Sequence, residues 1–112
     1  MRNEEAKMSE IDRENIGAIT GDWASGDVFI NGKTLDPAES FAITNISPNG
    51  FSWGCCGDGS TQLALAILLR YVPRLTALKL FYDFRCDIIS KLPRCGFKLS
   101  EESVKEWIAK RS

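Results

Sequence analysis

Three closely spaced glycines precede the most apolar stretch of the chain, residues 63–69. Glycine lets a backbone turn with positive φ and approach a ligand closely. If the apolar stretch is a helix, its first amide groups carry partial positive charge and favour anions. Hydroxyl and amide side chains stand at that helix start, and an indole ring that could stack on a base or sugar precedes the glycines. The candidate ligand-binding residues are therefore Trp53, Gly54, Gly57, Gly59, Ser60, Thr61 and Gln62.

The glycine spacing differs from that of the known phosphate-binding motifs. A P-loop needs a lysine directly before its Ser or Thr, and Gly59 stands in that place before Ser60. A dinucleotide fingerprint needs Gly-x-Gly-x-x-Gly in a parallel βαβ unit, and the order here is different. Asp58 would also repel a phosphate. The alternative interpretation is a tight strand-to-helix turn, in which the glycines allow Trp53 to pack closely on the helix.

The chain has four cysteines and no histidine. Cys-His catalysis is therefore excluded, and zinc would need four thiolates at unsuitable spacing. Cys55 or Cys56 beside a helix N-terminus could have a lowered pKa, but no second catalytic group stands at a fixed offset. We expect no enzyme activity, no metal and no cofactor. We expect reduced thiols with Cys86 in the core, and a disulfide from Cys95 to Cys55 or Cys56 is the open alternative.

Composition indicates a small globular protein. The 112 residues fit one domain, and 44% hydrophobic with 26% charged residues is ordinary for such a domain. The longest apolar run is far shorter than the roughly 20 residues that span a bilayer. Residues 1–14 are charged and lack the apolar centre of a signal peptide. We therefore expect a cytoplasmic protein that makes no membrane contact, with residues 1–14 as a flexible tail and residues 15–112 as a single domain.

The charges are unevenly divided between the two halves. Residues 1–61 hold 4 Lys/Arg and 10 Asp/Glu, a net charge of −6, and residues 62–112 hold 10 and 5, a net charge of +5. The sequence pI of about 5.4 argues against a nucleic-acid-binding role. A protein partner or an anionic small ligand fits this division. The alternative without a functional role is that two faces of one soluble domain carry opposite charge.

The N-terminal half has the alternation and turn signals of short strands. Asn31-Gly32 between two β-prone runs is typical of a type I′ hairpin turn, because both residues tolerate positive φ. A second turn signal follows at residues 47–50. The predicted strands are residues 16–20, 27–30, 33–35, 40–45 and 51–53, which form a small antiparallel sheet.

The second half has helical periodicity. Residues 62–72 are apolar on every side and predict a buried central helix, with Gly59 as N-cap and Gln62 reaching back to the free amide. Residues 74–91 predict one long amphipathic helix. Residues 96–99 are extended enough to rejoin the sheet, and Ser100 caps a short C-terminal helix. The predicted class is α+β, with the sheet packed on the central helix.

One segment resembles a known family. The resemblance is to an uncharacterised family of short prokaryotic and phage-borne proteins, a domain of unknown function, and rests on the motif Ser47-Pro48-x-Gly50-Phe51-x-Trp53-Gly54-x-x-Gly57-x-Gly59-x-x-Gln62-Leu63-Ala64-Leu65-Ala66. It implies an α+β domain and a setting in mobile elements. No activity comes with it.

These observations lead to two functional hypotheses. The first is a non-enzymatic binding module, an accessory or host-inhibitory counter-defence protein of a phage or mobile element that acts through a partner protein. The second is a small-ligand protein that binds or sequesters a nucleotide-like anion with the glycine-rich loop.

Overall fold

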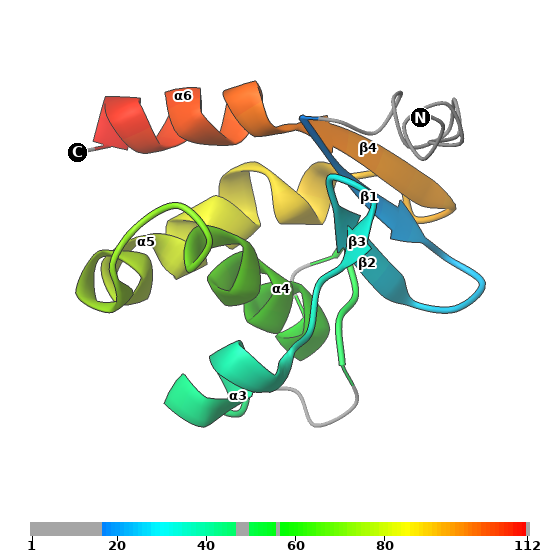
Figure 1. The fold of residues 1–112 in the computed structure, drawn as a ribbon, viewed down its shortest axis with the longest axis horizontal. Coiled ribbons are helices and arrows are strands. Elements are labelled where there is room, and N and C mark those ends of the chain that lie inside the picture. Colours follow the sequence, from blue (N-terminus) through cyan, green and yellow to red (C-terminus); the bar gives the residue numbers. More distant parts are fainter. Residues whose placement is uncertain (1–16, 47–49, 56, 112) are drawn as a thin grey trace, which may run out of the picture.

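The computed structural model describes residues 17–46, 50–55 and 57–111. The predicted tail at residues 1–14, the turn at residues 47–49 and Cys56 lie outside these ranges. The described part is an α+β structure in which a four-stranded antiparallel sheet lies beside a group of helices, with α4 at the centre (Figure 1).

The sheet is built from both ends of the described chain. Its strand order is β3-β2-β1-β4, and every neighbouring pair is antiparallel. The four strands are β1 (Ala18–Asp22), β2 (Asp27–Ile30), β3 (Lys33–Thr34) and β4 (Gly96–Ser100). The extended segment predicted at residues 96–99 thus joins the sheet, which is not confined to the N-terminal half.

The predicted Asn31-Gly32 hairpin is confirmed. Asn31 has φ 55° and Gly32 has φ 82°, which is the combination that a two-residue type I′ turn requires. The turn sets the register in which Ile30 lies opposite Lys33.

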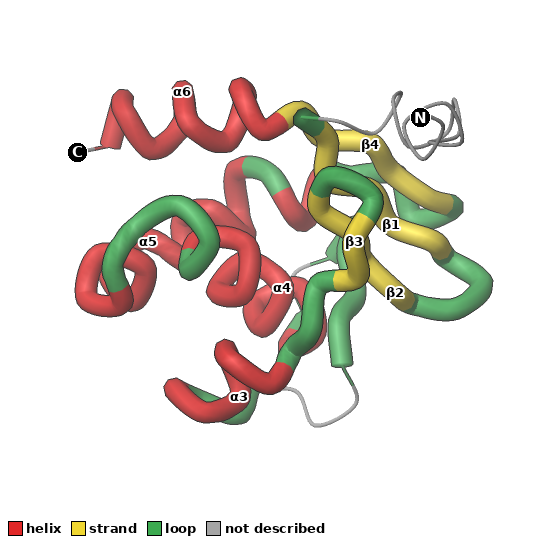
Figure 2. The backbone as a smooth tube through the Cα atoms, viewed as in Figure 1, coloured by secondary structure: helices red, strands yellow, loops and turns green. Residues whose placement is uncertain are grey.

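The helices lie to one side of the sheet (Figure 2), and β4 separates the last of them from the others along the chain. They are α3 (Ala38–Ile43), α4 (Asp58–Leu68), α5 (Arg74–Asp87), the 3₁₀ turn η1 (Ile89–Lys91) and α6 (Glu101–Arg111). The Ser100 hydroxyl accepts a hydrogen bond from the Ser103 amide at 3.0 Å, so the predicted cap of the last helix is confirmed.

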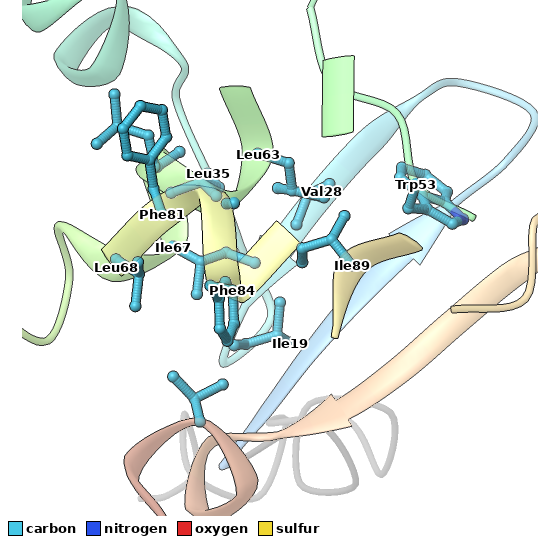
Figure 3. Close-up of a cluster of buried hydrophobic side chains, with 14 of the residues drawn as sticks. Ile19, Val28, Leu35, Trp53, Leu63, Ile67, Leu68, Phe81, Phe84 and Ile89 are labelled. Carbon is cyan, nitrogen blue, oxygen red and sulfur yellow. The ribbon is translucent and has the colours of Figure 1, made fainter. Parts of the chain in front are cut away.

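Helix α4 is the centre of the core, as its apolar sequence predicts. Its residues 63–68 are all at most 4% exposed. Side chains from the sheet, α5 and η1 surround them, among them Ile19, Phe84 and Ile89 (Figure 3). Each fully buried large apolar side chain stabilises the fold by about 1.5–3 kcal/mol. This wrapped helix therefore fixes the positions of the elements around it.

The prediction of a strand at residues 40–45 is wrong, because helix α3 covers most of that range. The Asp36 carboxylate accepts a hydrogen bond from the Ala38 amide at 2.9 Å, and the Ser40 hydroxyl donates to the Pro37 carbonyl at 2.9 Å. These local bonds favour a helix start. Phe41 and Ile43 alternate in a way that suits either a strand or a short helix, and the hydrogen bonds at Asp36 and Ser40 favour the helix.

One predicted strand, the bounds of two helices and one burial expectation also need correction. The central helix predicted at residues 62–72 is α4, which begins earlier and ends at Leu68. Residues 51–53 form no strand. The long helix ends at Asp87, because Ile88 departs from helical geometry with φ −118° and η1 follows. Cys86 is exposed rather than in the core, because Phe84 lies on the buried side of α5 and Cys86 on the other side.

Candidate functional site

The segment that carries the sequence-predicted site connects Trp53 to the first turn of α4. The helix begins at Asp58, with Gly57 as its N-cap residue at φ −81° and ψ −176°. The prediction of Gly59 as N-cap was therefore two residues late. Gln62, which the sequence assigned to a capping role, lies in the second turn of the helix.

Gly54 is the one glycine of the loop whose conformation demands glycine. Its φ is +77°, and a Cβ built on it would lie 2.4 Å from Arg94 Cγ and 2.8 Å from the Leu92 carbonyl oxygen. Its amide donates to the Ile89 carbonyl at 2.9 Å. Gly54 thus allows the loop to pack directly on the segment between α5 and β4.

Gly57 and Gly59 have different roles, and neither has positive φ. A Cβ on Gly59 would lie 2.4 Å from the Ser52 hydroxyl oxygen and 2.9 Å from the Ser52 amide nitrogen. Among the described residues, a Cβ on Gly57 would meet the Cys55 sulfur at an ordinary contact distance of 3.8 Å. The expectation that all three glycines turn the backbone through positive φ is therefore wrong for two of them, and close packing explains Gly59.

The hydroxyls of Ser60 and Thr61 are buried and already bonded. The Thr61 hydroxyl donates to the Gly57 carbonyl at 3.0 Å and accepts from Arg85 Nη1 at 2.9 Å. The Ser60 hydroxyl lies 3.4 Å from the Cys55 sulfur. These side chains hold the N-terminus of α4 to α5 and to the loop in front of it.

Within the described part of the chain, Gln62 bonds to a segment far away in the sequence. Its Oε1 accepts from the Ile46 amide at 2.7 Å, and its Nε2 donates to the Ser40 hydroxyl at 3.0 Å and to the Thr44 carbonyl at 3.1 Å. Gln62 is fully buried. It therefore anchors α3 and the following residues to α4.

Trp53 lies inside the protein at 1% exposure (Figure 3). Its ring packs edge-on against Phe97 at 5.0 Å and against Trp23 at 6.4 Å between ring centroids. Gly21 makes room for this cluster, because a Cβ there would lie 2.2 Å from the Phe97 ring. A base or sugar could stack on Trp53 only if one of these neighbours moved.

The surroundings of the Cys55 thiol favour its ionised form. The hydrogen bond with the Ser60 hydroxyl lowers the pKa of this thiol, and the Gly57 amide adds to the effect against a partial opposition from burial. Ser52 and the Arg94 charge contribute less. Cys55 is half-buried, and Cys55, Cys86 and Cys95 are all free thiols. A thiolate here would be stabilised, as expected for a cysteine close to a helix N-terminus.

Sequence reasoning did not find the surface pair Trp23 and Arg94. Trp23 is 53% exposed in the turn between β1 and β2. The Arg94 guanidinium carbon lies 5.6 Å from the centroid of the Trp23 ring, a cation–π distance. The Gly, Asp and Ser residues around Trp23 indicate a loop at this position, but they do not indicate that Arg94 packs on Trp23.

Two kinds of site find no support in the part of the chain that the structure describes. No three His, Cys, Asp or Glu side chains gather there as ligands for a metal ion. None of the helices there has the length and apolar character needed to cross a bilayer.

Comparison with protein families identifies the family to which the chain belongs. Residues 20–110 match a Family of unknown function (DUF6166). The chain belongs to this family. The DUF6166 match begins in β1 and ends near the end of α6, so it includes most of the sheet, α4 and the whole loop from Trp53 to Gln62. Searches of curated proteins and of solved structures gave no match.

Proposed function

We propose that this DUF6166 protein is a non-enzymatic binding module that acts through a partner protein, and that Trp23 lies at the centre of its contact surface. The observation that carries the proposal is a large aromatic side chain held at the surface by a rigid turn. Tryptophan, tyrosine and arginine are the residues most enriched among the contacts that dominate binding energy in protein interfaces.

The turn that presents Trp23 is fixed by several hydrogen bonds. The Asp22 carboxylate accepts from the Ala24 amide at 3.1 Å and from the Ser25 hydroxyl at 3.2 Å. The Gly26 amide donates to the Asp22 carbonyl at 2.8 Å. A contact residue that is ordered before binding loses less conformational entropy when the partner arrives.

Trp23 is also fixed from two sides. Its ring packs edge-on against the buried Trp53, and Arg94 covers it at cation–π distance. Arg94 is itself held, because its Cγ lies directly over Gly54. The loop glycine, the buried indole and the exposed indole thus form one connected unit that supports a pre-organised surface.

The environment of the glycine-rich loop supports this proposal over binding of a nucleotide-like ligand. The side chains of Ser60, Thr61 and Gln62 are buried and bonded within the protein. An anion at the α4 N-terminus would also meet the Asp58 carboxylate in the first turn. A ligand would therefore have to replace existing bonds.

The biological setting is proposed on the sequence resemblance alone. A short protein of a phage or mobile element, of accessory or counter-defence type, would act by occupying a host protein. The net charge of −6 over residues 1–61 suits a basic face on that partner.

The test compares Trp23→Ala with Tyr82→Ala in affinity capture from a host-cell lysate. Tyr82 is the matched control, because it is 55% exposed on α5. We expect a protein that wild type and Tyr82→Ala retain and Trp23→Ala loses, with unchanged circular dichroism in both variants. Equal retention by all three proteins, or no retained protein, would refute the proposal.

A second measurement distinguishes the ligand alternative. A ligand that binds only the folded state raises the apparent unfolding free energy by RT ln(1 + [L]/Kd). Under the protein-binding proposal, thermal unfolding in the presence of a nucleotide panel should show no shift. A saturable shift that is lost in Gly59→Ala would favour the glycine-rich loop as a nucleotide site.

A further inference from the structure

A groove of about 590 Å³ opens between the β2–β3 hairpin, the start of α3 and Arg70, which lies two residues beyond the C-terminal end of α4. Its volume is in the range of pockets that take small organic ligands. Its residues Ile30 and Asn31 are at the C-terminal end of β2, whereas the Trp23 turn precedes the N-terminal end of β2, so the groove is separate from the surface proposed above.

The floor of the groove is apolar and its hairpin wall is ordered. Ile30 and Leu35 are each 8% exposed and belong to the hydrophobic core. The Asn31 amide donates to the Ala18 carbonyl at 2.9 Å, and the Leu35 amide donates to the Val28 carbonyl at 2.7 Å. The floor therefore offers a fixed apolar surface for a short side chain.

Charges of both signs stand around this floor. Lys33 and Arg70 are positive, and Asp36 and Glu39 are negative. In the described ranges the only ion pairs are those of Arg111 with Asp83 and Asp87, so none of the four groove charges is paired.

The Asp36 carboxylate has room for a further contact. One of its oxygens, Oδ1, accepts from the Ala38 amide at 2.9 Å. Its other oxygen has no hydrogen-bond donor in the described part of the chain. The groove thus carries two free cations and two carboxylates with spare acceptor capacity.

We infer that this groove binds a short zwitterionic peptide of two or three residues. Its ammonium group would meet Asp36 and Glu39, its carboxylate would meet Lys33 and Arg70, and an apolar side chain would rest on Ile30 and Leu35. A simple anion or cation fits less well, because either would meet two like charges. Arginine in particular suits a carboxylate, because its guanidinium can donate two parallel hydrogen bonds.

The probe is the dipeptide leucyl-alanine, titrated while the amide NMR signals of Lys33, Thr34 and Arg70 are followed. Three reference compounds separate its parts: N-acetyl-leucyl-alanine, leucyl-alaninamide and free leucine. We expect saturable shifts with leucyl-alanine and at least tenfold weaker binding of the acetylated and amidated forms. Free leucine should also bind at least tenfold more weakly.

Arg70→Gln and Glu39→Gln test the two charge pairs, and Lys105→Gln and Glu102→Gln on the exposed surface of α6 are the matched controls. Each groove variant should weaken leucyl-alanine binding at least tenfold, and the controls should bind like wild type. Three results would each overturn the inference: no saturation, equal binding of a blocked peptide or of leucine, or unchanged binding in both groove variants. The Trp23 proposal stands or fails separately, because Trp23→Ala leaves this groove intact.

Discussion

Gln62 Nε2 on α4 donates a hydrogen bond to the Ser40 hydroxyl on α3 at 3.0 Å, and both residues are fully buried. The Ser40 hydroxyl in turn donates to the Pro37 carbonyl, so the chain of bonds continues to the residue before α3. This contact joins the central helix to the helix that directly follows the hairpin. It is therefore a structural bond across the fold, at a residue that sequence alone offered as a ligand contact.

Replacing Gln62 by leucine should destabilise the protein by about 3 kcal/mol, because the Ile46 amide and the Thr44 carbonyl would be left without this partner. Ser40→Ala should cost about 1 kcal/mol, since it removes one hydroxyl from the same network. Urea unfolding followed by circular dichroism measures both values. If Gln62→Leu lowered the unfolding free energy by less than Ser40→Ala does, Gln62 would not be a structural anchor.

Gly54→Ala should destabilise the protein much more than Gly57→Ala. At Gly54 a side chain would have to adopt φ +77°, at about 1–2 kcal/mol, and would also collide with Arg94 and Leu92. At Gly57 the backbone is in an ordinary region and the space is free, so alanine should cost about 0.5 kcal/mol as at other N-cap positions.

Thermal and urea unfolding of the two alanine variants provide the measurement. Gly57→Ala is the matched control, because it adds the same methyl group to the same loop. Similar losses in the two variants would contradict the assignment of Gly54 as the conformationally required glycine.

The parts of the fold that were predictable from sequence are those that depend on local chemistry. Asn31-Gly32 specifies its turn by the φ values that both residues tolerate. The all-round apolar run of α4 requires burial on every side, and Ser100 marks the start of α6 through its own hydroxyl. The prediction of a strand at residues 40–45 failed because an alternating Phe41 and Ile43 suit either a strand or a short helix. The hydrogen bond from the Ala38 amide to the Asp36 carboxylate favours the helix.

The site was predictable only as a segment. The sequence located the loop and the helix start, but Gln62 bonds to residues 16 to 22 positions away. Trp23 and Arg94 are in contact although most of the sequence lies between them. Contacts at such separations are set by how the whole core packs, and no local pattern carries them. The burial of Trp53 likewise depends on Phe97 from the last strand.

The Asp87 carboxylate should make the stability sensitive to acid. The indole N–H of Trp107 donates to it at 2.9 Å and the Arg111 guanidinium also donates, and together they hold the pKa of Asp87 below its ordinary value of 3.8. Since the folded-state pKa is the lower one, this stabilisation is complete above the unfolded-state pKa. It is lost as the pH falls through the folded-state pKa.

Urea unfolding of wild type and Asp87→Asn between about pH 6 and pH 2 measures this effect. The stability difference between the two proteins should shrink as the pH falls below 3.8. Glu102→Gln is the control, since that side chain is exposed on α6 and should leave the pH profile unchanged. If the stability difference between wild type and Asp87→Asn stayed constant over the whole pH range, Asp87 would not be the source of the acid sensitivity.

The Cys55 thiol should be alkylated at a pH at which an ordinary thiol is still protonated. The Ser60 hydrogen bond is the largest cause of its lowered pKa, followed by the Gly57 amide. The rate of iodoacetamide addition, measured by peptide mass spectrometry against pH, should therefore have its midpoint below the ordinary cysteine value of 9.0. Ser60→Ala should move that midpoint upward.

The Cys55 measurement is made in a Cys56→Ser background, so that the adjacent thiol does not contribute. Ser103→Ala is the control, because its hydroxyl bonds to Ser100 at the start of α6 and it should leave the midpoint in place. The polarisation of Cys55 depends on its position in front of α4, because Ser60 is fixed there by burial in the first turn. A midpoint that stays at 9.0, or one that Ser60→Ala does not shift, would mean that the hydroxyl contact does not stabilise the thiolate.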